Sequence, residues 1–362
     1  MDCPARDLRK MTSKGQDEDD KKREEEEKMK GGEKRKREDH SQAEDTQKKK
    51  RTGPNARDSE DEGPRAGPST SVTSGSTAPN TIGGFVVHEV LGKGSFGKVM
   101  LASVPGQNIY KAIKIINIGN NAEALERERR ILLAARDCPF VSHLSASLKS
   151  KRHMYFILEY LSGGSLESLI IQSGKLNIEL VRFYTAELIC GIQFLHGHGI
   201  AHRDIKPANI MLDEDGHIRI IDLGLAQDGL TASTKICGQT GTYRYMAPEV
   251  HLDKPYTVAV DWWGLGMVVS KMSSGKSPFY DLNQMQKVFL SITRKKPKIP
   301  SWFDEDLKHL ILNLLQKDPE MRLGVSGNIR DHPFFRTICW EELETRRAQP
   351  PIPSCSGDKP SG

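Results

Sequence analysis

Two short segments hold side chains whose types and order could carry out a defined reaction. Residues 202–209 read His-Arg-Asp-Ile-Lys-Pro-Ala-Asn, and Asp222 follows thirteen positions after Asn209. Asp204 offers a carboxylate that can accept a hydroxyl proton, and Lys206 offers a cation for a developing negative charge. Asn209 and Asp222 add oxygen atoms, which are the ligands that Mg²⁺ prefers. A base, a cation and two metal ligands in this order predict phosphoryl transfer.

A glycine-rich segment between two β-like runs is a candidate phosphate-binding loop. Gly92, Gly94 and Gly97 form a Gly-x-Gly-x-x-Gly pattern, with β-forming residues at 85–91 and at 98–102. In dinucleotide-binding folds this pattern opens a helix instead. Strands on both sides predict a hairpin tip, where glycine N–H groups approach phosphate oxygens without a Cβ in the way.

A lysine and a carboxylate are expected beside this loop. Residues 110–116 form the next β-like run, and Lys114 on it could reach the α- and β-phosphates of a nucleotide. Residues 122–135 are expected to be helical, with an N-cap just before them at residue 120 or 121. A glutamate of this helix should pair with Lys114. The spacing leaves three alternatives open, namely Glu123, Glu126 and Glu128.

The run at 155–161 predicts a strand that leads into a hinge between two lobes. It ends before Ser162 and a pair of glycines, where backbone groups could meet a nucleotide base. Two roles stay open for Leu158 on this strand, either lining the back of a base pocket or packing in the core only.

Residues farther along the chain are expected to support the catalytic loop. Asp261 opens an apolar helix and should brace the backbone of that loop, and Glu249 should form a buried pair with Arg322. Residues 225–246 would form an activation loop, for which Arg203 is a natural phosphate-binding partner. The candidate phosphorylation sites on this loop are Thr231, Ser233, Thr234 and Thr240.

Composition separates a polar tail from a region that can fold. Residues 1–51 are highly charged and contain no Val, Ile, Phe, Tyr or Trp, and residues 52–80 are rich in Gly, Pro, Ser and Thr. Such segments bury too little apolar surface to offset the entropy lost on ordering, so residues 1–80 are expected to be disordered. The net charge of +5 is small and mixed, which does not indicate a nucleic-acid-binding protein.

An intracellular location is expected. No run approaches the ~18 apolar residues of a membrane span, and the N-terminus has no apolar signal stretch. The six cysteines show no metal-binding spacing, as expected for reduced thiols. The basic clusters 34–37 and 48–51 are either part of a solvated polyampholyte or a bipartite nuclear-import signal. The cytoplasm is therefore the expected location, with the nucleus added under the second interpretation.

Residues 85–353 resemble the AGC group of serine/threonine protein kinases, most of all the novel protein kinase C subfamily of the delta or theta type. The motifs that carry the resemblance are 91–99, 154–160, 213–218, 261–263, 332–335 and 340–347. The resemblance implies an α+β, bilobal protein-kinase fold with a small antiparallel β-sheet and an αC helix in its N-lobe and a mostly helical C-lobe. The implied boundaries are a kinase domain at 85–335 (N-lobe 85–160, C-lobe 161–335), the tail 1–80 before it, and a truncated C-terminal extension at 336–362 after it.

The resemblance also implies roles for individual residues. Asp204 would be the proton acceptor, with Lys206 beside it, and Asn209 and Asp222 would hold Mg²⁺. Lys114 would bind ATP. Glu128 fits the family's register for the partner of this lysine, with Glu126 as the fallback. The implied nucleotide-binding residues are Leu91, Gly92, Lys93, Gly94, Ser95, Phe96, Gly97, Lys98, Val99, Ala112, Lys114, Glu128, Leu158, Glu159, Leu161 and Ser165.

The expected function is transfer of the ATP γ-phosphate to Ser and Thr hydroxyls of proteins in intracellular signalling. Lys206 together with Thr242 is similar to the serine/threonine class rather than the tyrosine class. A catalytically weak pseudokinase scaffold is the alternative, and a nuclear interaction protein that acts through its charged tail is a third hypothesis. The expected partners are protein substrates and an upstream kinase or an activator that binds the N-lobe, with neither nucleic-acid binding nor a membrane domain expected.

The chain departs from the family where substrates and activation are controlled. Ser165, Ala208 and Lys271 stand where basophilic members carry carboxylates, which predicts weak or no preference for Arg near the acceptor. Gln227 replaces a basic residue of the activation loop, so activity is expected to depend less on phosphorylation of this loop. Leu223 replaces the usual Phe after Asp222, with apolar packing kept.

Overall fold

A computed structural model of the chain describes residues 80–94, 97–119, 121–231, 234–279 and 284–351. All of them belong to one compact unit, residues 77–362. Except for Asn80, the tail expected to be disordered lies outside the described residues, and so do both basic clusters. Ser95 and Phe96 of the glycine-rich loop and Ser233 of the activation loop also lie outside them.

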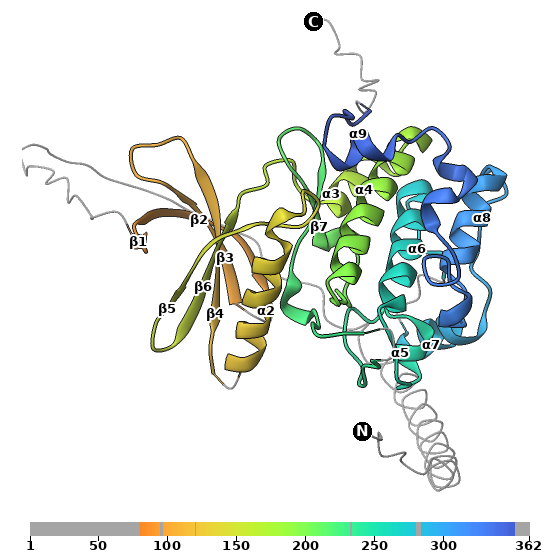
Figure 1. Cartoon of the computed structure of the whole chain (residues 1–362), viewed down its shortest axis with the longest axis horizontal. Coiled ribbons are helices and arrows are strands. Elements are labelled where there is room, and N and C mark those ends of the chain that lie inside the picture. The colour runs from red at the N-terminus through yellow and green to blue at the C-terminus, as the bar shows by residue number, and fades with distance from the viewer. Residues whose placement is uncertain (1–79, 95–96, 120, 232–233, 280–283, 352–362) are drawn as a thin grey trace, which may run out of the picture. The chain divides into compact units, whose positions relative to one another are not determined.

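A six-stranded antiparallel sheet forms the N-lobe, with strand order β1-β2-β3-β4-β6-β5 (Figure 1). Ile113 and Ile115 on β4 belong to a small apolar core on one face of this sheet. Because side chains alternate along a strand, Lys114 between them lies on the opposite face. The strands are β1 Thr81–Ile82, β2 Phe85–Gly94, β3 Gly97–Ser103, β4 Tyr110–Asn117, β5 Leu144–Lys149 and β6 His153–Glu159.

The glycine-rich loop is the tip of the β2–β3 hairpin, which confirms the prediction from its β-like flanks. The two strands pair as far as Gly94 opposite Gly97. Gly97 has a φ of +144°, and a Cβ there would lie 2.0 Å from the carbonyl oxygen of Ile115. Only glycine lets β3 approach β4 this closely.

The helix between β4 and β5 is α2, Ala122–Ala134, followed by a 3-10 turn at Ala135–Asp137. The expected helix 122–135 is therefore correct to one residue. Asn121 is its N-cap residue, although its side chain makes no capping hydrogen bond. Leu125, Ile131 and Leu132 are buried at helical spacing, and they hold one face of α2 against the body of the molecule.

Helices α4 and α6 form the centre of the C-lobe, where they contact each other, and α6 also contacts α8 (Figure 1). Both are largely apolar and mostly buried, α6 more completely than α4, as expected for helices in the interior of a lobe. The hairpin β7–β8 carries the catalytic segments at its ends. The elements are α3 Leu166–Ser173, α4 Ile178–Gly197, β7 Ile210–Leu212, β8 Ile218–Ile220, α5 Pro248–His251, α6 Ala259–Ser274, α7 Met285–Arg294, α8 Glu305–Leu314 and α9 Trp340–Glu344.

Two long-range contacts close the C-lobe. The guanidinium of Arg322, fully buried, donates to both carboxylate oxygens of Glu249 at 2.8 and 3.0 Å, which confirms the predicted pair. The C-terminal segment returns to the lobe through α9, which packs against α4. Within the described residues, no helix combines the length and apolar character needed to cross a bilayer.

Candidate active site

Asp261 of α6 fixes the backbone that precedes Asp204. Its carboxylate accepts the backbone N–H groups of His202 and Arg203, both at 2.8 Å, and lies 2.8 Å from Nε2 of His196. Burial alone would raise the pKa of Asp261, but the hydrogen bond and charge of His196 lower this pKa below its usual value. A buried ionised carboxylate therefore braces the catalytic loop, as predicted.

Asp204 lies at the centre of a hydrogen-bonded cluster. Its Oδ1 accepts the backbone N–H of Thr242 at 2.8 Å, and its Oδ2 accepts Nζ of Lys206 at 2.7 Å and Nδ2 of Asn209 at 3.0 Å. Lys206 also donates to Oγ1 of Thr242 at 2.6 Å. Both carboxylate oxygens are thus oriented, in a side chain that is almost fully buried.

Lys114 joins two carboxylates from different elements. Its Nζ lies 2.7 Å from Oε1 of Glu128 on α2 and 2.7 Å from Oδ1 of Asp222. Of the three glutamates left open by the helical spacing, Glu128 is the one that pairs with Lys114. Glu126 lies 3.8 Å from Arg129 on the same helix instead, and Glu123 is exposed.

The charges of this triad follow from burial and pairing. Burial alone would lower the pKa of Lys114, but Glu128 and Asp222 outweigh it and raise this pKa above its usual value. Burial likewise opposes ionisation of Asp222, yet Lys114 lowers the pKa of this carboxyl. Burial raises the pKa of Glu128 in spite of its pairing with Lys114. Lys114 and Asp222 therefore remain charged at neutral pH.

A cleft of about 550 Å³ opens between the sheet and the C-lobe. This volume suits a ligand of nucleotide size. The cleft is lined by the glycine hairpin, β4, α2, the hinge and the segments that carry Asn209 and Asp222. A Cβ added at Gly92 or Gly94 would meet no protein atom within 4 Å, so packing inside the protein does not require either glycine.

A model of the protein kinase domain matches residues 85–335. The chain belongs to the protein kinase family. The predicted α+β, bilobal kinase fold is therefore confirmed by this match together with the sheet and helices described above.

Known protein kinases are similar in sequence to most of this chain. Protein kinase C delta type of Mus musculus is 41% identical over 277 residues, covering 75% of this chain and 41% of that protein. Serine/threonine-protein kinase YPK1 of Saccharomyces cerevisiae is 39% identical over 279 residues, again 75% of this chain and 41% of the relative. These similarities confirm the expected AGC, protein kinase C-like membership. The chain spans about two fifths of the length of the curated relatives it matches.

The kinase cleft brings together most of the residues predicted to bind a nucleotide. Lys93 and Ser165 do not line it, and Ser165 instead is the N-cap of α3, where its Oγ accepts the N–H of Ser168 at 3.1 Å. Ser95 and Phe96 lie outside the described residues. The predicted residues that do line the cleft are Leu91, Gly92, Gly94, Gly97, Lys98, Val99, Ala112, Lys114, Glu128, Leu158, Glu159 and Leu161, with Asn209 and Asp222 at its floor.

Several lining residues were not predicted as nucleotide contacts. Leu132 lies four residues after Glu128 on the same face of α2, and Ile221 directly precedes Asp222. Helical spacing and adjacency could have identified these two, whereas Ser142 carries no signal in the sequence. The full set outside the list of predicted nucleotide-binding residues is Leu132, Ser142, Tyr160, Ser162, Gly164, Ala208, Met211, Ile221 and Leu223, of which Ser162 and Gly164 belong to the expected hinge.

The donor set of the cleft fits Mg²⁺-ATP. Asn209 uses its Nδ2 to bind Asp204, so its Oδ1 is the atom that remains for a metal ion. Asp222 binds Lys114 through one carboxylate oxygen and keeps the other. Among the described residues no group of three or more His, Cys, Asp or Glu could hold a metal ion alone. Two hard oxygen ligands suit a metal whose coordination is completed by phosphate oxygens and water.

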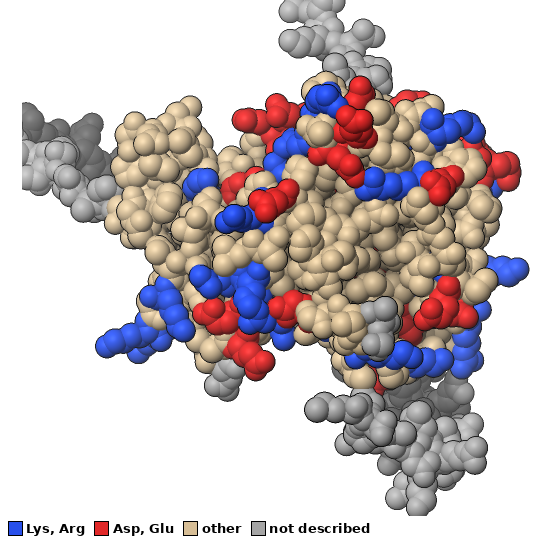
Figure 2. All heavy atoms as spheres, viewed as in Figure 1, with Lys and Arg blue, Asp and Glu red and all other residues tan. Residues whose placement is uncertain are grey.

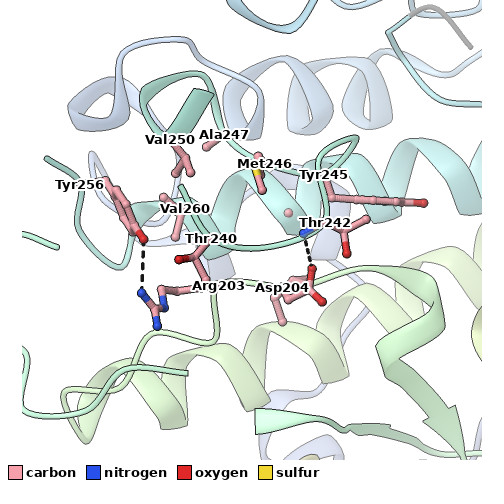
Figure 3. A pocket seen from close by; sticks show the side chains of 12 residues that line it. Arg203, Asp204, Thr240, Thr242, Tyr245, Met246, Ala247, Val250, Tyr256 and Val260 are labelled. Atoms are coloured by element: carbon pink, nitrogen blue, oxygen red, sulfur yellow. Dashed lines mark hydrogen bonds between the residues drawn. The ribbon is translucent and has the colours of Figure 1, made fainter. Parts of the chain in front are cut away.

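Arg203 of the kinase domain, which directly precedes Asp204, is bound within the chain (Figure 3). Its Nε donates to the carbonyl oxygen of Leu225 at 2.6 Å, and its Nη1 lies 3.4 Å from the hydroxyl of Tyr256. Thr240 lines the same small pocket as Arg203 and Tyr256. A carbonyl and a phenol thus hold Arg203, and its predicted binding of a loop phosphate stays a prediction.

Proposed function

We propose that the protein transfers the γ-phosphate of ATP to Ser and Thr hydroxyls of protein substrates. The observation that carries this proposal is the pairing of Lys114 with both Glu128 and Asp222 while Asp204 and Lys206 also bond each other. The nucleotide-binding and proton-accepting parts are therefore assembled together in one arrangement.

Each residue has a separate task in this proposal. Bound Mg²⁺-ATP supplies the phosphoryl group and the leaving group. Lys114 orients the α- and β-phosphates, and Asn209 and Asp222 hold the metal ion. Asp204 accepts a hydrogen bond from the substrate hydroxyl and takes its proton as the new oxygen–phosphorus bond forms. The bond between the γ-phosphorus and the β,γ-bridging oxygen breaks in the same step, and ADP leaves. Lys206, whose Nζ lies 2.7 Å from Oδ2 of Asp204, neutralises charge on the transferred group.

Thr242 supports the choice of Ser and Thr as acceptors. Its backbone N–H and its Oγ1 bond Asp204 and Lys206, the two residues that would meet the acceptor hydroxyl. The segment that contains Thr242 is thereby held next to the two residues that would receive the acceptor hydroxyl. The similarity to a yeast protein named as a serine/threonine-protein kinase supports the same class.

A degenerate peptide library tests the proposal. The full chain with Mg²⁺-ATP should phosphorylate peptides with Ser or Thr acceptors and leave a matched Tyr library unmodified. Nucleotide binding without transfer to any library would contradict the proposal and favour the pseudokinase.

The same library profile tests the prediction made from Ser165, Ala208 and Lys271. Peptides with Arg near the acceptor should show no enrichment, because these three positions offer no carboxylate to attract Arg. A profile dominated by Arg would contradict this part.

We also propose an intracellular location with access to the nucleus, and protein partners that include an upstream kinase or an N-lobe-binding activator. The basic clusters at 34–37 and 48–51 support nuclear import. Deleting residues 1–52 should lower the nuclear-to-cytoplasmic ratio of a fluorescent fusion in imaged cells. An unchanged ratio would contradict the import signal.

A further inference from the structure

A line of alternating charges joins the C-terminal segment to the hinge. Nη2 of Arg346, just after α9, pairs with Oδ2 of Asp213. The same oxygen lies 3.8 Å from Nε of Arg219, and this Nε lies 3.7 Å from Oε1 of Glu159. Arg346, Asp213, Arg219 and Glu159 are called the ion-pair chain below.

The two inner members of the ion-pair chain are less exposed than its ends, since the side chains of Arg346 and Glu159 are each 21% exposed. Figure 2 shows Lys and Arg mixed with Asp and Glu on the surface around α9, where water and salt screen charges. In contrast, the side chain of Arg219 is 9% exposed and that of Asp213 is 12% exposed. Nε of Arg219 and Nε of Arg346 are buried without a hydrogen-bond partner among the described residues. Charge attraction therefore contributes to holding these groups together, and loss of one member removes part of the charge compensation of the next.

The backbone conformation of Arg346 supports the interpretation that charge attraction holds this residue in place. Arg346 has a φ of +57°, in the left-handed region that is unfavourable for a residue with a side chain. Its neighbour Arg347 instead lies exposed and pairs with Glu341 of α9. The pairing with Asp213 is thus a contact between distant parts of the chain, whereas the pairing of Arg347 is local.

The ion-pair chain meets the hinge at two of its members, Glu159 and Asp213. Glu159 is the last residue of β6, and it lines the cleft. On the other side, Leu212 next to Asp213 accepts the N–H of Gly163 at 3.0 Å and donates to the carbonyl of Gly164 at 2.8 Å. A Cβ at Gly163 would lie 2.7 Å from the carbonyl oxygen of Asp213. Residues 159–164, which line much of the cleft, therefore contact Arg219 through Glu159 and the backbone of Leu212 through Gly163 and Gly164.

We propose that Arg346 is a positioning residue, which fixes the hinge for nucleotide binding through the ion-pair chain. Residues 336–351 do not line the cleft themselves. Without the charge of Arg346, Asp213 attracts Arg219 alone, and the attraction of Arg219 for Glu159 weakens. The hinge backbone then loses its fixed distance from the cleft floor. This inference rests on the proposed function only in that the cleft binds ATP.

The variant Arg346→Met in the full chain tests the inference, because methionine keeps the apolar stem and removes the charge. We expect the Kd of a fluorescent ATP analogue and the KM for ATP to rise about 5-fold, with kcat within about twofold. Arg347→Met is the matched control and should leave both constants unchanged. Arg346→Lys keeps the charge and should restore most of the affinity. Arg346→Met combined with Arg219→Met should bind no more weakly than Arg219→Met alone.

Amide hydrogen exchange of Gly163 provides a readout without nucleotide. Arg346→Met should speed this exchange, because the bond from Gly163 to Leu212 loses its support. A variant that only lowers the unfolding temperature, with Kd, KM and exchange unchanged, would overturn the inference. A wild-type chain that binds the analogue but transfers no phosphate would contradict the proposed function, and the Kd comparison would still decide the inference. A wild-type chain that bound no nucleotide would overturn the role of Arg346 in nucleotide binding, and the exchange rate would then report only whether Arg346 holds the hinge.

Discussion

Asp204→Asn is expected to lower the rate of phosphate transfer to peptides about 10³-fold, while the affinity for nucleotide changes less than twofold. The asparagine side chain has nearly the same shape but cannot take the proton of the substrate hydroxyl. Affinity should persist because Asp204 does not line the cleft, unlike Asn209 and Asp222. Single-turnover transfer and titration with a fluorescent ATP analogue measure the two quantities separately.

The control for this experiment is Asp215→Asn, which changes an exposed carboxylate in the turn between β7 and β8. Its transfer rate and affinity should equal those of the wild-type chain. A tenfold or smaller loss of transfer in Asp204→Asn would show that another group accepts the proton. A parallel loss of nucleotide affinity would show instead that the substitution disturbs the cleft through Asn209, which donates to Asp204.

Arg322→Met is expected to destabilise the kinase domain by about 3–5 kcal/mol. Arg322 is fully buried, and besides Glu249 it donates to the carbonyl oxygens of Ala259 at 2.7 Å and Gln316 at 3.2 Å. Its removal leaves the buried carboxylate of Glu249 without its partner and two carbonyl groups without a donor. Denaturant unfolding followed by circular dichroism measures the loss.

Two further variants show whether the loss comes from the uncompensated charge. Lys308→Met removes an exposed pair with Glu305 on α8 and should cost less than about 0.5 kcal/mol. Adding Glu249→Leu to Arg322→Met removes the stranded carboxylate, so the double variant should recover part of the lost stability. If the double variant were less stable than Arg322→Met alone, the explanation by an unpaired buried charge would be wrong.

The catalytic constellation was accessible from sequence because its members lie close together in the chain. Asp204, Lys206 and Asn209 sit within one loop, and a two-stranded hairpin returns the chain to place Asp222 beside them. The choice of Glu128 over its neighbours was also within reach, since it shares a helical face with the buried Leu125 and Leu132. Local spacing is sufficient to predict the site residues wherever one element presents several of them.

Other features depend on contacts that local spacing does not encode. The resemblance implies that Ser165 binds the nucleotide, but in the structure its hydroxyl caps α3, which is the usual role of serine just before a helix. Arg346 and Asp213 are separated by 133 residues, and although both lie in segments that carry the family resemblance, local spacing does not indicate that they pair. Such pairs become visible only when the chain path is known.

The salt bridges of Lys114 have a consequence for the energetics of ligand capture. Both carboxylates share one ammonium, so the position of α2 is tied to that of Asp222. A nucleotide that binds only this arrangement has an apparent affinity reduced by the fraction of molecules that lack it. Substitutions that break either salt bridge should therefore weaken the apparent affinity by lowering that fraction.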